Sequence, residues 1–350
     1  MKISIVTVYN SLNSGSFLQA FTLMKALEMS DNEVVFLKTK ARNPLRDVFL
    51  SSLRSLSNGD YKKIGYLLKK YTKFRSIVSK LPKIGMVRNE MIKQDIYVLG
   101  SDEIWNVKRP DFNKFPVFWG YNIDSNSIIA YAPSINRSTI LDILQYEFTQ
   151  LAINNMNSIG VRDKHTKITL EELTNKEISL VLDPTMLFDT DFYRKYEAPI
   201  KDKNYILVYS YSNHFNEKQI KRIKEYSKRK ELPLISVNHM MSWCDKSVPV
   251  SPFEFLTYYR DASYVITDTF HGTIFSIIYQ KKFLCYGDDN IKVLDLLDRM
   301  NLNLQNYDGL SDVSIILDKE INYDAIMKTL DEQKKESWNY LNKAMMKDEN

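Results

Sequence analysis

Cysteine and histidine are scarce in this sequence, which has two cysteines and four histidines among 350 residues. Cys244 and Cys285 lie far apart and outside any CxxC pattern. They imply neither a disulfide framework nor a cysteine-ligated metal site. A reducing setting therefore fits the chain best, and we expect no metal and no cofactor.

Long apolar runs are also missing, since stretches such as IFSII are far shorter than the ~20 residues that span a bilayer. The first residues, MKISIVTVYN, alternate like a strand and lack the apolar core and cleavage site of a signal peptide. We therefore expect a cytoplasmic protein.

Several motifs of nucleotide-binding and hydrolytic enzymes are absent. No GxGxxG follows the first predicted strand, and neither GxxxxGK[ST] nor GxSxG occurs. Asp189-Thr190-Asp191 has the form of a metal-binding DxD, but patterns of three residues are common by chance, so we assign it no role.

What is present describes a globular chain with room for two domains, at 44% hydrophobic and 26% charged residues. Basic residues concentrate from Ala41 to Lys93, where thirteen lysines or arginines face three acids, while the whole chain has a net charge of +5. The part GDYKKIGYLLKKYTKFRSIVSKLPK interleaves apolar and basic residues at helical spacing. Two interpretations stay open: peripheral contact with an anionic membrane or another polyanion, and a solvated helical face. We expect no nucleic-acid partner.

Strand-like runs alternate with helical patterns along the chain, which is typical of parallel sheets covered on both faces. The runs are KISIVTVY, NEVVFLKT, DIYVLG, SIIAYAP, NSIGVRD, ISLVLDP, YILVYSYS, PLISV, SYVITD and KFLCYG. They predict an α/β protein of two Rossmann-like domains, 1–195 and 196–322, facing each other across a cleft. We predict a basic helical insert at about 41–93, and an amphipathic helix at 323–350 that packs back on the first domain.

Four polar clusters follow predicted strands, and ligands of open α/β sheets bind at the carboxyl ends of strands. Arg162 can hold a carboxylate or phosphate with two hydrogen bonds, Lys292 is a compact cation, and a helix starting near Gly272 adds backbone N–H groups. The sequence therefore predicts a small anion pocket. Its candidate residues are Ser101, Asp102, Glu103, Trp105, Asn106, Arg162, Thr269, His271, Gly272, Thr273 and Lys292.

Each cluster also has a structural explanation. A histidine after a strand is more often structural than catalytic, and an arginine next to an aspartate is usually a surface ion pair. Trp105 could contact a sugar or be buried in the core, and both remain open. Only the combination of clusters supports a site.

The strings GSDEIWN, IAYAPS, GVRDKHT, VLDPTMLF and SYVITDTFHGTIFSIIYQKKFLCYG, followed by Lys292, resemble the polysaccharide pyruvyl transferase family over roughly Lys2 to Leu304. The resemblance implies a GT-B-like fold. It also implies transfer of the enolpyruvyl group of phosphoenolpyruvate to two hydroxyls of a sugar, which forms a pyruvate ketal and releases phosphate. The acceptor would belong to a polysaccharide, such as an exopolysaccharide, or to a lipid-linked oligosaccharide.

By position, Arg162, His271 and Lys292 match the family's donor-binding arginine, its histidine and its lysine. Two positions depart from the pattern: Glu103 stands where many relatives have Gln, and Thr269 where many have Arg or Ser. We expect Arg162 and Lys292 to hold the donor, His271 to act as general acid or phosphate partner, and Asp102 or Glu103 to act as base. Alternatives are a sugar-nucleotide glycosyltransferase and a non-catalytic sugar- or phosphate-binding protein, since a fold does not fix an activity.

Overall fold

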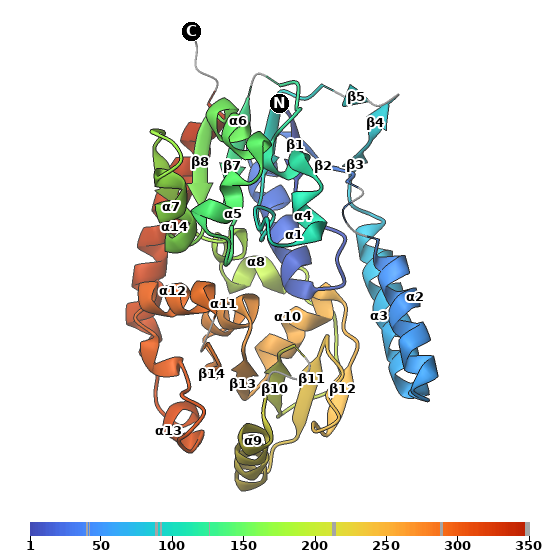
Figure 1. Cartoon of the computed structure of the whole chain (residues 1–350). Coiled ribbons are helices and arrows are strands. Elements are labelled where there is room, and N and C mark those ends of the chain that lie inside the picture. Colours follow the sequence, from blue (N-terminus) through green and yellow to red (C-terminus); the bar gives the residue numbers. More distant parts are fainter. Residues whose placement is uncertain are drawn as a thin grey trace.

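The structure is a computed structural model, and it describes residues 1–39, 41, 43–87, 90–91, 93–125, 127–211, 215–287 and 290–346. Two parallel sheets lie one above the other (Figure 1). The predicted α/β architecture with two Rossmann-like units is confirmed. Residues 288 and 289, a few positions before Lys292, and the end of the predicted C-terminal helix, 347–350, lie outside the described residues.

The first sheet has the strand order β3-β2-β1-β6-β7-β8-β9, and its described strand pairs are parallel. The order reverses between β1 and β6, as in a Rossmann fold. Strands β6, β7 and most of β8 are buried, which is why they read as continuous apolar runs in the sequence. The strands are β1 (Lys2–Val6), β2 (Glu33–Leu37), β3 (Lys83–Ile84), β6 (Ile96–Leu99), β7 (Ile128–Tyr131), β8 (Ser158–Val161) and β9 (Ile178–Leu180).

The second sheet has the order β12-β11-β10-β13-β14, again parallel, with its reversal between β10 and β13. Its strands are β10 (Ile206–Tyr209), β11 (Leu234–Val237), β12 (Lys246–Val248), β13 (Tyr264–Thr267) and β14 (Lys282–Cys285). All ten predicted strands form. The sequence missed β3, β12 and the pair β4 (Met86–Val87) and β5 (Glu90–Met91), because two or three residues give no periodic signal.

Helices connect and cover the strands, with several capped as the sequence indicates. The Ser251 hydroxyl oxygen accepts from the backbone N–H of Glu254, and the backbone N–H of Ser251 donates to the Glu254 carboxylate, which makes a capping box at α10. The helices are α1 (Ser14–Glu28), α2 (Pro44–Ser57), α3 (Tyr61–Val78), α4 (Pro110–Asn113), α5 (Ile140–Leu144), α6 (Glu147–Asn155), α7 (Lys164–Glu171), α8 (Thr190–Arg194), α9 (Glu217–Lys230), α10 (Pro252–Asp261), α11 (Phe270–Ile278), α12 (Ile291–Arg299), α13 (Ser314–Leu317) and α14 (Tyr323–Met345). Short 3-10 turns lie at Pro116–Trp119, Pro184–Met186 and Asn303–Gln305.

The two sheets are joined by apolar packing and by α14. Phe17 and Phe21 of α1 lie edge-on to Phe253 of α10, with ring centroids 6.0 and 5.5 Å apart. Helix α14 starts beside the second sheet and runs along one side of the first (Figure 1), where the Tyr340 hydroxyl donates to Ala130 O at 2.8 Å. The predicted domain boundary at 195/196 falls between α8 and β10.

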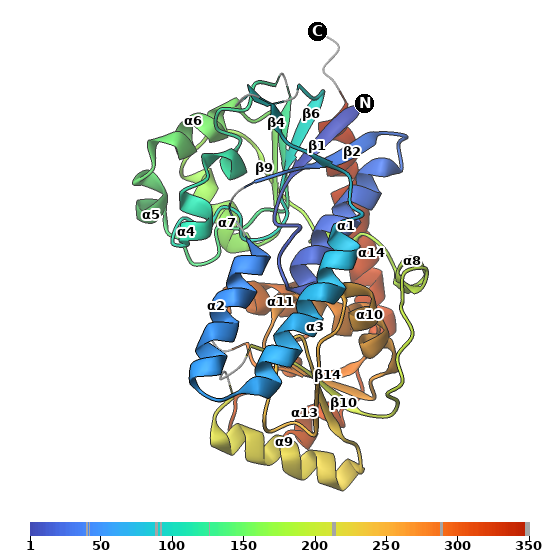
Figure 2. The same cartoon turned by 90° about the vertical axis from the view of Figure 1, so that its right-hand side faces the viewer.

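Helices α2 and α3 form a hairpin in the predicted basic segment, and it lies beside the second sheet (Figures 1 and 2). Helix α3 contacts that unit directly: Lys70 Nζ donates to Asn238 O at 2.6 Å, and Lys73 pairs with Glu254 at 2.7 Å. None of the described helices combines the length and apolar character needed to cross a membrane.

Candidate functional site

The carboxyl ends of both sheets border one hollow between them, with a volume of about 380 Å³, and we call it the cleft hollow. Segments that follow β1, β6, β8, β10 and β13 line it, so it lies at the reversal points of both sheets, where α/β proteins bind ligands. Its lining residues are Val8, Ser11, Leu12, Asn13, Ser16, Asp47, Asp102, Glu103, Arg109, Phe112, Arg162, Tyr209, Tyr211, His239, Thr269, Phe270, His271, Asn290 and Lys292.

Arg162 directly follows β8 and is almost completely buried. Its Nη1 donates to Asp183 Oδ2 at 2.8 Å, and its Nη2 lies 3.6 Å from Asp102 Oδ1. Burial alone would lower the pKa of Arg162, but Asp183 and then Asp102 outweigh it, so the pKa is raised and the guanidinium stays charged. Its Nε has no hydrogen-bond partner among the described residues.

His271 lies in the first turn of α11 and reaches the same carboxylate. Its Nε2 is 3.6 Å from Asp183 Oδ2, an ion-pair distance that is too long for a hydrogen bond, and this buried atom has no hydrogen-bond partner among the described residues. Burial alone would raise the pKa of Asp183, but His271 and Arg162 hold it well below its usual range. Gly15 of α1 packs on the imidazole: a Cβ there would lie 2.5 Å from the ring.

Lys292 of α12 crosses from the second unit to Glu103 of the first, with Nζ 2.5 Å from Oε1. Asn136 donates to the other carboxylate oxygen of Glu103 at 2.7 Å. Burial alone would raise the pKa of Glu103, but Lys292 outweighs it by charge and hydrogen bond and holds the pKa well below its usual range. Glu103 is therefore a fixed anion and a poor proton acceptor at neutral pH.

The position of Asp102 is fixed by an unusual backbone conformation just after β6. A Cβ on Gly100 would lie 2.1 Å from Tyr131 O, so only glycine fits there, and Asp102 itself has φ +84°, in the left-handed region that costs a non-glycine residue energy. The backbone N–H of Glu103 donates to Asp102 Oδ1 at 2.8 Å, and Ser134 N donates to its carbonyl at 2.9 Å. Burial alone would raise the pKa of Asp102, but Arg162 and then His271 lower it.

The Phe270 ring links the three predicted cations. Its centroid lies 4.7 Å from the Arg162 guanidinium carbon and 6.0 Å from Lys292 Nζ, and the ring of its neighbour His271 is 5.5 Å away. The structure therefore brings Arg162, His271 and Lys292 together at one hollow, from three separate stretches of sequence.

The family profile described as polysaccharide pyruvyl transferase matches residues 13–290, which is most of the chain. The chain belongs to this family. The predicted resemblance is thereby confirmed at the level of the family.

Solved structures similar to this pyruvyl transferase family member include two UDP-GlcNAc 2-epimerases. The Neisseria meningitidis enzyme bound to UDP-GlcNAc has TM-score 0.54 and 10% identity and covers 99% of both chains. A putative Listeria monocytogenes enzyme has TM-score 0.52 and 11% identity and covers 99% of this chain and 90% of its own. An α-glucosyltransferase in complex with UDP and a 13-mer DNA has TM-score 0.53 and 8% identity, covering 97% and 95%. These are GT-B-type neighbours, so the predicted fold class is confirmed. A search of curated proteins finds no match.

Five predicted site residues of this family member do not line the cleft hollow. Of the two interpretations left open for Trp105, the structure supports burial in the core: the side chain is completely buried and stacks on Trp119, with the ring centroids 4.8 Å apart. Thr269 caps α11 through a bond from Gly272 N, and Thr273 bonds Thr269 O, so the expected free N–H groups at 272 and 273 are occupied. Ser101 and Asn106 bond neighbouring side chains: Ser101 donates to Asp183, and Asn106 binds Glu103 and Ser138.

The sequence reasoning missed much of the site, including Asp183, Asn13 and Gly15. Asp183 follows β9 just as Arg162 follows β8, so the strand-end rule could have found it. Asn13 and Gly15 gave no comparable signal. Asn13 accepts from Tyr209 at 3.2 Å and donates to Tyr211 at 3.3 Å, contacts that exist only once the two sheets face each other.

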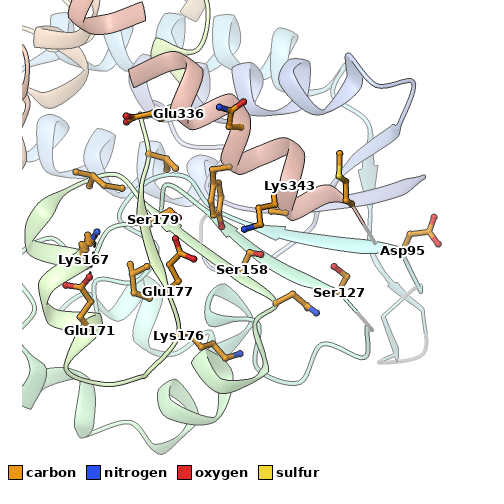
Figure 3. A pocket seen from close by; sticks show the side chains of 18 of the residues that line it. Asp95, Ser127, Ser158, Lys167, Glu171, Lys176, Glu177, Ser179, Glu336 and Lys343 are labelled. Atoms are coloured by element: carbon orange, nitrogen blue, oxygen red, sulfur yellow. Dashed lines mark ion pairs between the residues drawn. The ribbon is translucent and has the colours of Figure 1, made fainter. Parts of the chain in front are cut away.

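A larger hollow of about 1170 Å³ lies at the other end of the strands of the first sheet from the cleft hollow, and we call it the edge hollow (Figure 3). It borders the amino ends of β6 to β9, and α14 supplies part of its wall. Among the described residues its charged lining is balanced: Lys93, Lys167, Lys176 and Lys343 against Asp95, Glu171, Glu177 and Glu336. Figure 3 shows all of these except Lys93 labelled and spread around the hollow. Within the described part of the chain, no group of three or more His, Cys, Asp or Glu side chains is placed to hold a metal ion.

Proposed function

We propose that this family member transfers the enolpyruvyl group of phosphoenolpyruvate to two hydroxyls of a sugar. The observation that carries the proposal is the convergence of Arg162, His271 and Lys292 on the cleft hollow in a chain of this family. The donor has one carboxylate and one phosphate. A hollow with several fixed cations at strand ends suits such a ligand.

The reaction is balanced as follows. Phosphoenolpyruvate and a diol give a ketal and inorganic phosphate: two C–O bonds form at C2 and the C2–O bond to phosphate breaks. One hydroxyl proton ends on the methylene carbon, which becomes a methyl group, and the other ends on phosphate. The protein must therefore move protons and stabilise charge at C2 and at the leaving phosphate. We propose that it does so without a metal or other cofactor.

Arg162 and Lys292 would hold the carboxylate and phosphate as preorganised charges. The Nε of Arg162 and the Nε2 of His271 are buried and have no hydrogen-bond partner among the described residues. The Nε–H of Arg162 can donate to an anion, and His271 Nε2 can do so in the tautomer that carries a proton there. His271 would protonate the donor or neutralise the departing phosphate. Asp102 would accept the proton of the sugar hydroxyl, because both carboxylate oxygens of Glu103 are engaged.

The acceptor would be a sugar of a polysaccharide or of a lipid-linked oligosaccharide. The latter would place the protein at the inner face of a membrane, where an exopolysaccharide precursor could be modified. Nothing in the strand-end geometry selects one sugar, so an acceptor panel is needed.

The test gives the purified protein phosphoenolpyruvate with β-galactosides, glucosides and ManNAc-containing oligosaccharides. Phosphate release and the mass of the sugar product are followed. Phosphoenolpyruvate alone at ~100 times its Kd should add about 2.7 kcal/mol to the free energy of unfolding. Asp102→Asn should lower kcat by about 100-fold, whereas Glu103→Gln should chiefly raise KM, because it loosens Lys292.

Two outcomes would reject the proposal. Stabilisation by UDP- or GDP-sugars and none by phosphoenolpyruvate would favour a sugar-nucleotide glycosyltransferase. Binding of phosphoenolpyruvate without phosphate release with any acceptor would favour a non-catalytic binding protein.

A further inference from the structure

Helix α2 exposes a row of large apolar side chains that nothing in the described structure covers. Leu45, Phe49, Leu53 and Leu56 are spaced by three or four residues, so they share one face of the helix, and Leu50 lies beside them. Their exposed fractions are 57%, 60%, 47% and 52%, and that of Leu50 is 43%. Single exposed leucines are ordinary on protein surfaces, but a continuous row of five marks an interaction surface. We call it the α2 stripe.

Helix α3 holds α2 in this position and exposes fewer large apolar side chains than α2 does, Tyr61 and Leu68. Tyr66 and Phe74 are buried, and the Tyr66 hydroxyl donates to Val248 O at 3.1 Å. Lys70 and Lys73 are engaged with Asn238 and Glu254. The interleaved basic and apolar pattern of α3 is therefore mostly a packing pattern, and α2 lies on its outer side (Figures 1 and 2).

The charge of the hairpin complements an anionic surface. Its exposed basic side chains make no ion pair with any described residue; they are Arg46, Arg54, Lys62, Lys63, Lys69 and Arg75. From Pro44 to Val78 the acids are Asp47 and Asp60. Basic residues beside an exposed apolar helix face suit a membrane surface with anionic lipids, where headgroups attract the cations and the apolar side chains enter the acyl boundary.

The stripe also lies near the cleft hollow. Asp47, in the first turn of α2, lines that hollow, so the N-terminal end of the stripe-bearing helix reaches its mouth. A surface bound to the stripe would thus lie next to the entrance of the candidate active site.

We propose that the α2 stripe docks on an anionic lipid bilayer and presents the cleft hollow to a sugar acceptor carried by a lipid. The acceptor half of this inference rests on the proposed function, whereas the docking half does not. A second copy of the chain is the competing occupant. Apposing two hairpins would bring two sets of unpaired cations together, and this repulsion favours the anionic bilayer.

The experiment measures co-sedimentation of the full chain with vesicles of phosphatidylcholine alone and with about one third phosphatidylglycerol. The protein should bind the anionic vesicles, and more weakly as salt is raised. Phe49→Ser with Leu53→Ser should weaken binding by about 100-fold, since each side chain is worth about tenfold or more on burial in an apolar phase. Ile315→Ser on α13, on the other side of the second unit and 64% exposed, is the matched control and should bind as the wild type does.

Charge is tested separately. Glu substitutions at Lys62, Lys63 and Lys69 should weaken anionic binding by about 100-fold or more, at roughly tenfold for each charge near the surface. Glu substitutions at three exposed lysines of α9, Lys218, Lys224 and Lys228, change the net charge equally and should have a much smaller effect. Lys70 is left unchanged because it is buried.

The docking proposal is overturned if the wild type ignores anionic vesicles, or if the stripe variants bind as tightly as the wild type. It is also overturned if the stripe variants merely convert a dimer to a monomer in sedimentation velocity. Turnover of a soluble acceptor is measured in parallel. An absence of turnover in every sample would count against the proposed function. Vesicle binding would still test the docking proposal in that case.

Discussion

The cleft hollow and the edge hollow lie at opposite ends of the strands of the first sheet. The larger hollow is not the one that gathers the buried charged groups. The edge hollow is about three times larger, at about 1170 against 380 Å³. Its charges are balanced and come mostly from exposed or half-buried side chains. The cleft hollow instead gathers buried ion pairs from both sheets, Arg162 with Asp183 and Lys292 with Glu103.

The comparison shows that the direction of the strands, and not the volume of a hollow, indicates where the candidate active site lies. At the carboxyl ends of parallel strands the chain leaves the sheet at the reversal of strand order, so loops diverge and leave room for a ligand. At the amino ends the charged side chains of the edge hollow make local contacts: Lys167 lies 3.7 Å from Glu171, and Lys176 Nζ donates to Asn154 O. At the cleft hollow the pKa values of three buried carboxyl groups, Asp102, Glu103 and Asp183, are all lowered by neighbouring cationic side chains.

The largest effect on turnover should come from removing single charged or ionisable side chains, and it should differ between the two hollows. Arg162→Ala and His271→Ala should each lower turnover by about 100-fold or more, because each removes a donor from the transition-state site. Lys167→Ala and Lys343→Ala in the edge hollow should stay within about twofold, since both side chains are solvated. Phosphate release under saturating donor is the measurement.

A control is needed because Arg162→Ala leaves Asp183 buried with one cation fewer, and the variant could unfold. His271→Gln keeps a polar side chain of similar size and carries the test alone in that case. Equal losses from both hollows, or none from either, would abolish the distinction between them.

A smaller effect should follow from crowding the cleft hollow without touching a charge. Gly15→Ala puts a Cβ 2.5 Å from the His271 ring, so the ring or α1 must shift, at a cost of ~1–3 kcal/mol in the free energy of unfolding. Turnover should fall by about tenfold as the imidazole is displaced. Urea denaturation and steady-state kinetics together measure the two consequences.

Gly65→Ala is the matched control. Gly65 lies in α3 with nothing within 4 Å of an added Cβ, so alanine should stabilise the helix by up to ~1 kcal/mol and leave turnover unchanged. A Gly15→Ala variant as active as the wild type would show that the close packing of α1 on His271 is not needed for turnover.

The strands and the strand-end residues were predictable for a physical reason. Buried parallel strands must be apolar at nearly every position, so the polar residue that ends such a run is conspicuous. Arg162, His271 and Asp102 were found in this way. Asp183 obeys the same rule, and it stayed outside the predicted site because the string VLDPTMLF was treated only as a family signature.

The remaining features depend on contacts between distant segments, which no local pattern encodes. Trp105 is buried because Trp119 is available to stack on it, and Glu103 is a poor base because Lys292 arrives from the other unit. The basic segment shows the same limit: its pattern indicated an amphipathic helix, but not that α3 would bury Lys70 while α2 exposed its leucines.

The smallest effect concerns the free energy of unfolding. It compares a buried lysine next to the cleft hollow, Lys70, with an exposed lysine at the edge hollow, Lys343. Burial lowers the pKa of Lys70 from 10.5 to about 7, and its Nζ donates to Asn238 O. Below about pH 7 the folded and unfolded chains both carry this proton, so the group adds no pH dependence there. Above that, up to about pH 10.5, only the unfolded chain keeps it, and stability rises by about 1.4 kcal/mol per pH unit. Lys70→Met should remove this rise.

The measurement is urea denaturation at about pH 7.5 and about pH 8.5, where the wild type should gain about 1 kcal/mol more than Lys70→Met does. Lys343→Met is the control, because its exposed ammonium group meets water in both the folded and the unfolded chain. A wild-type slope equal to that of Lys70→Met would mean that Lys70 keeps its proton in the folded chain. The hairpin would then present one more charge to its surroundings than its packing indicates.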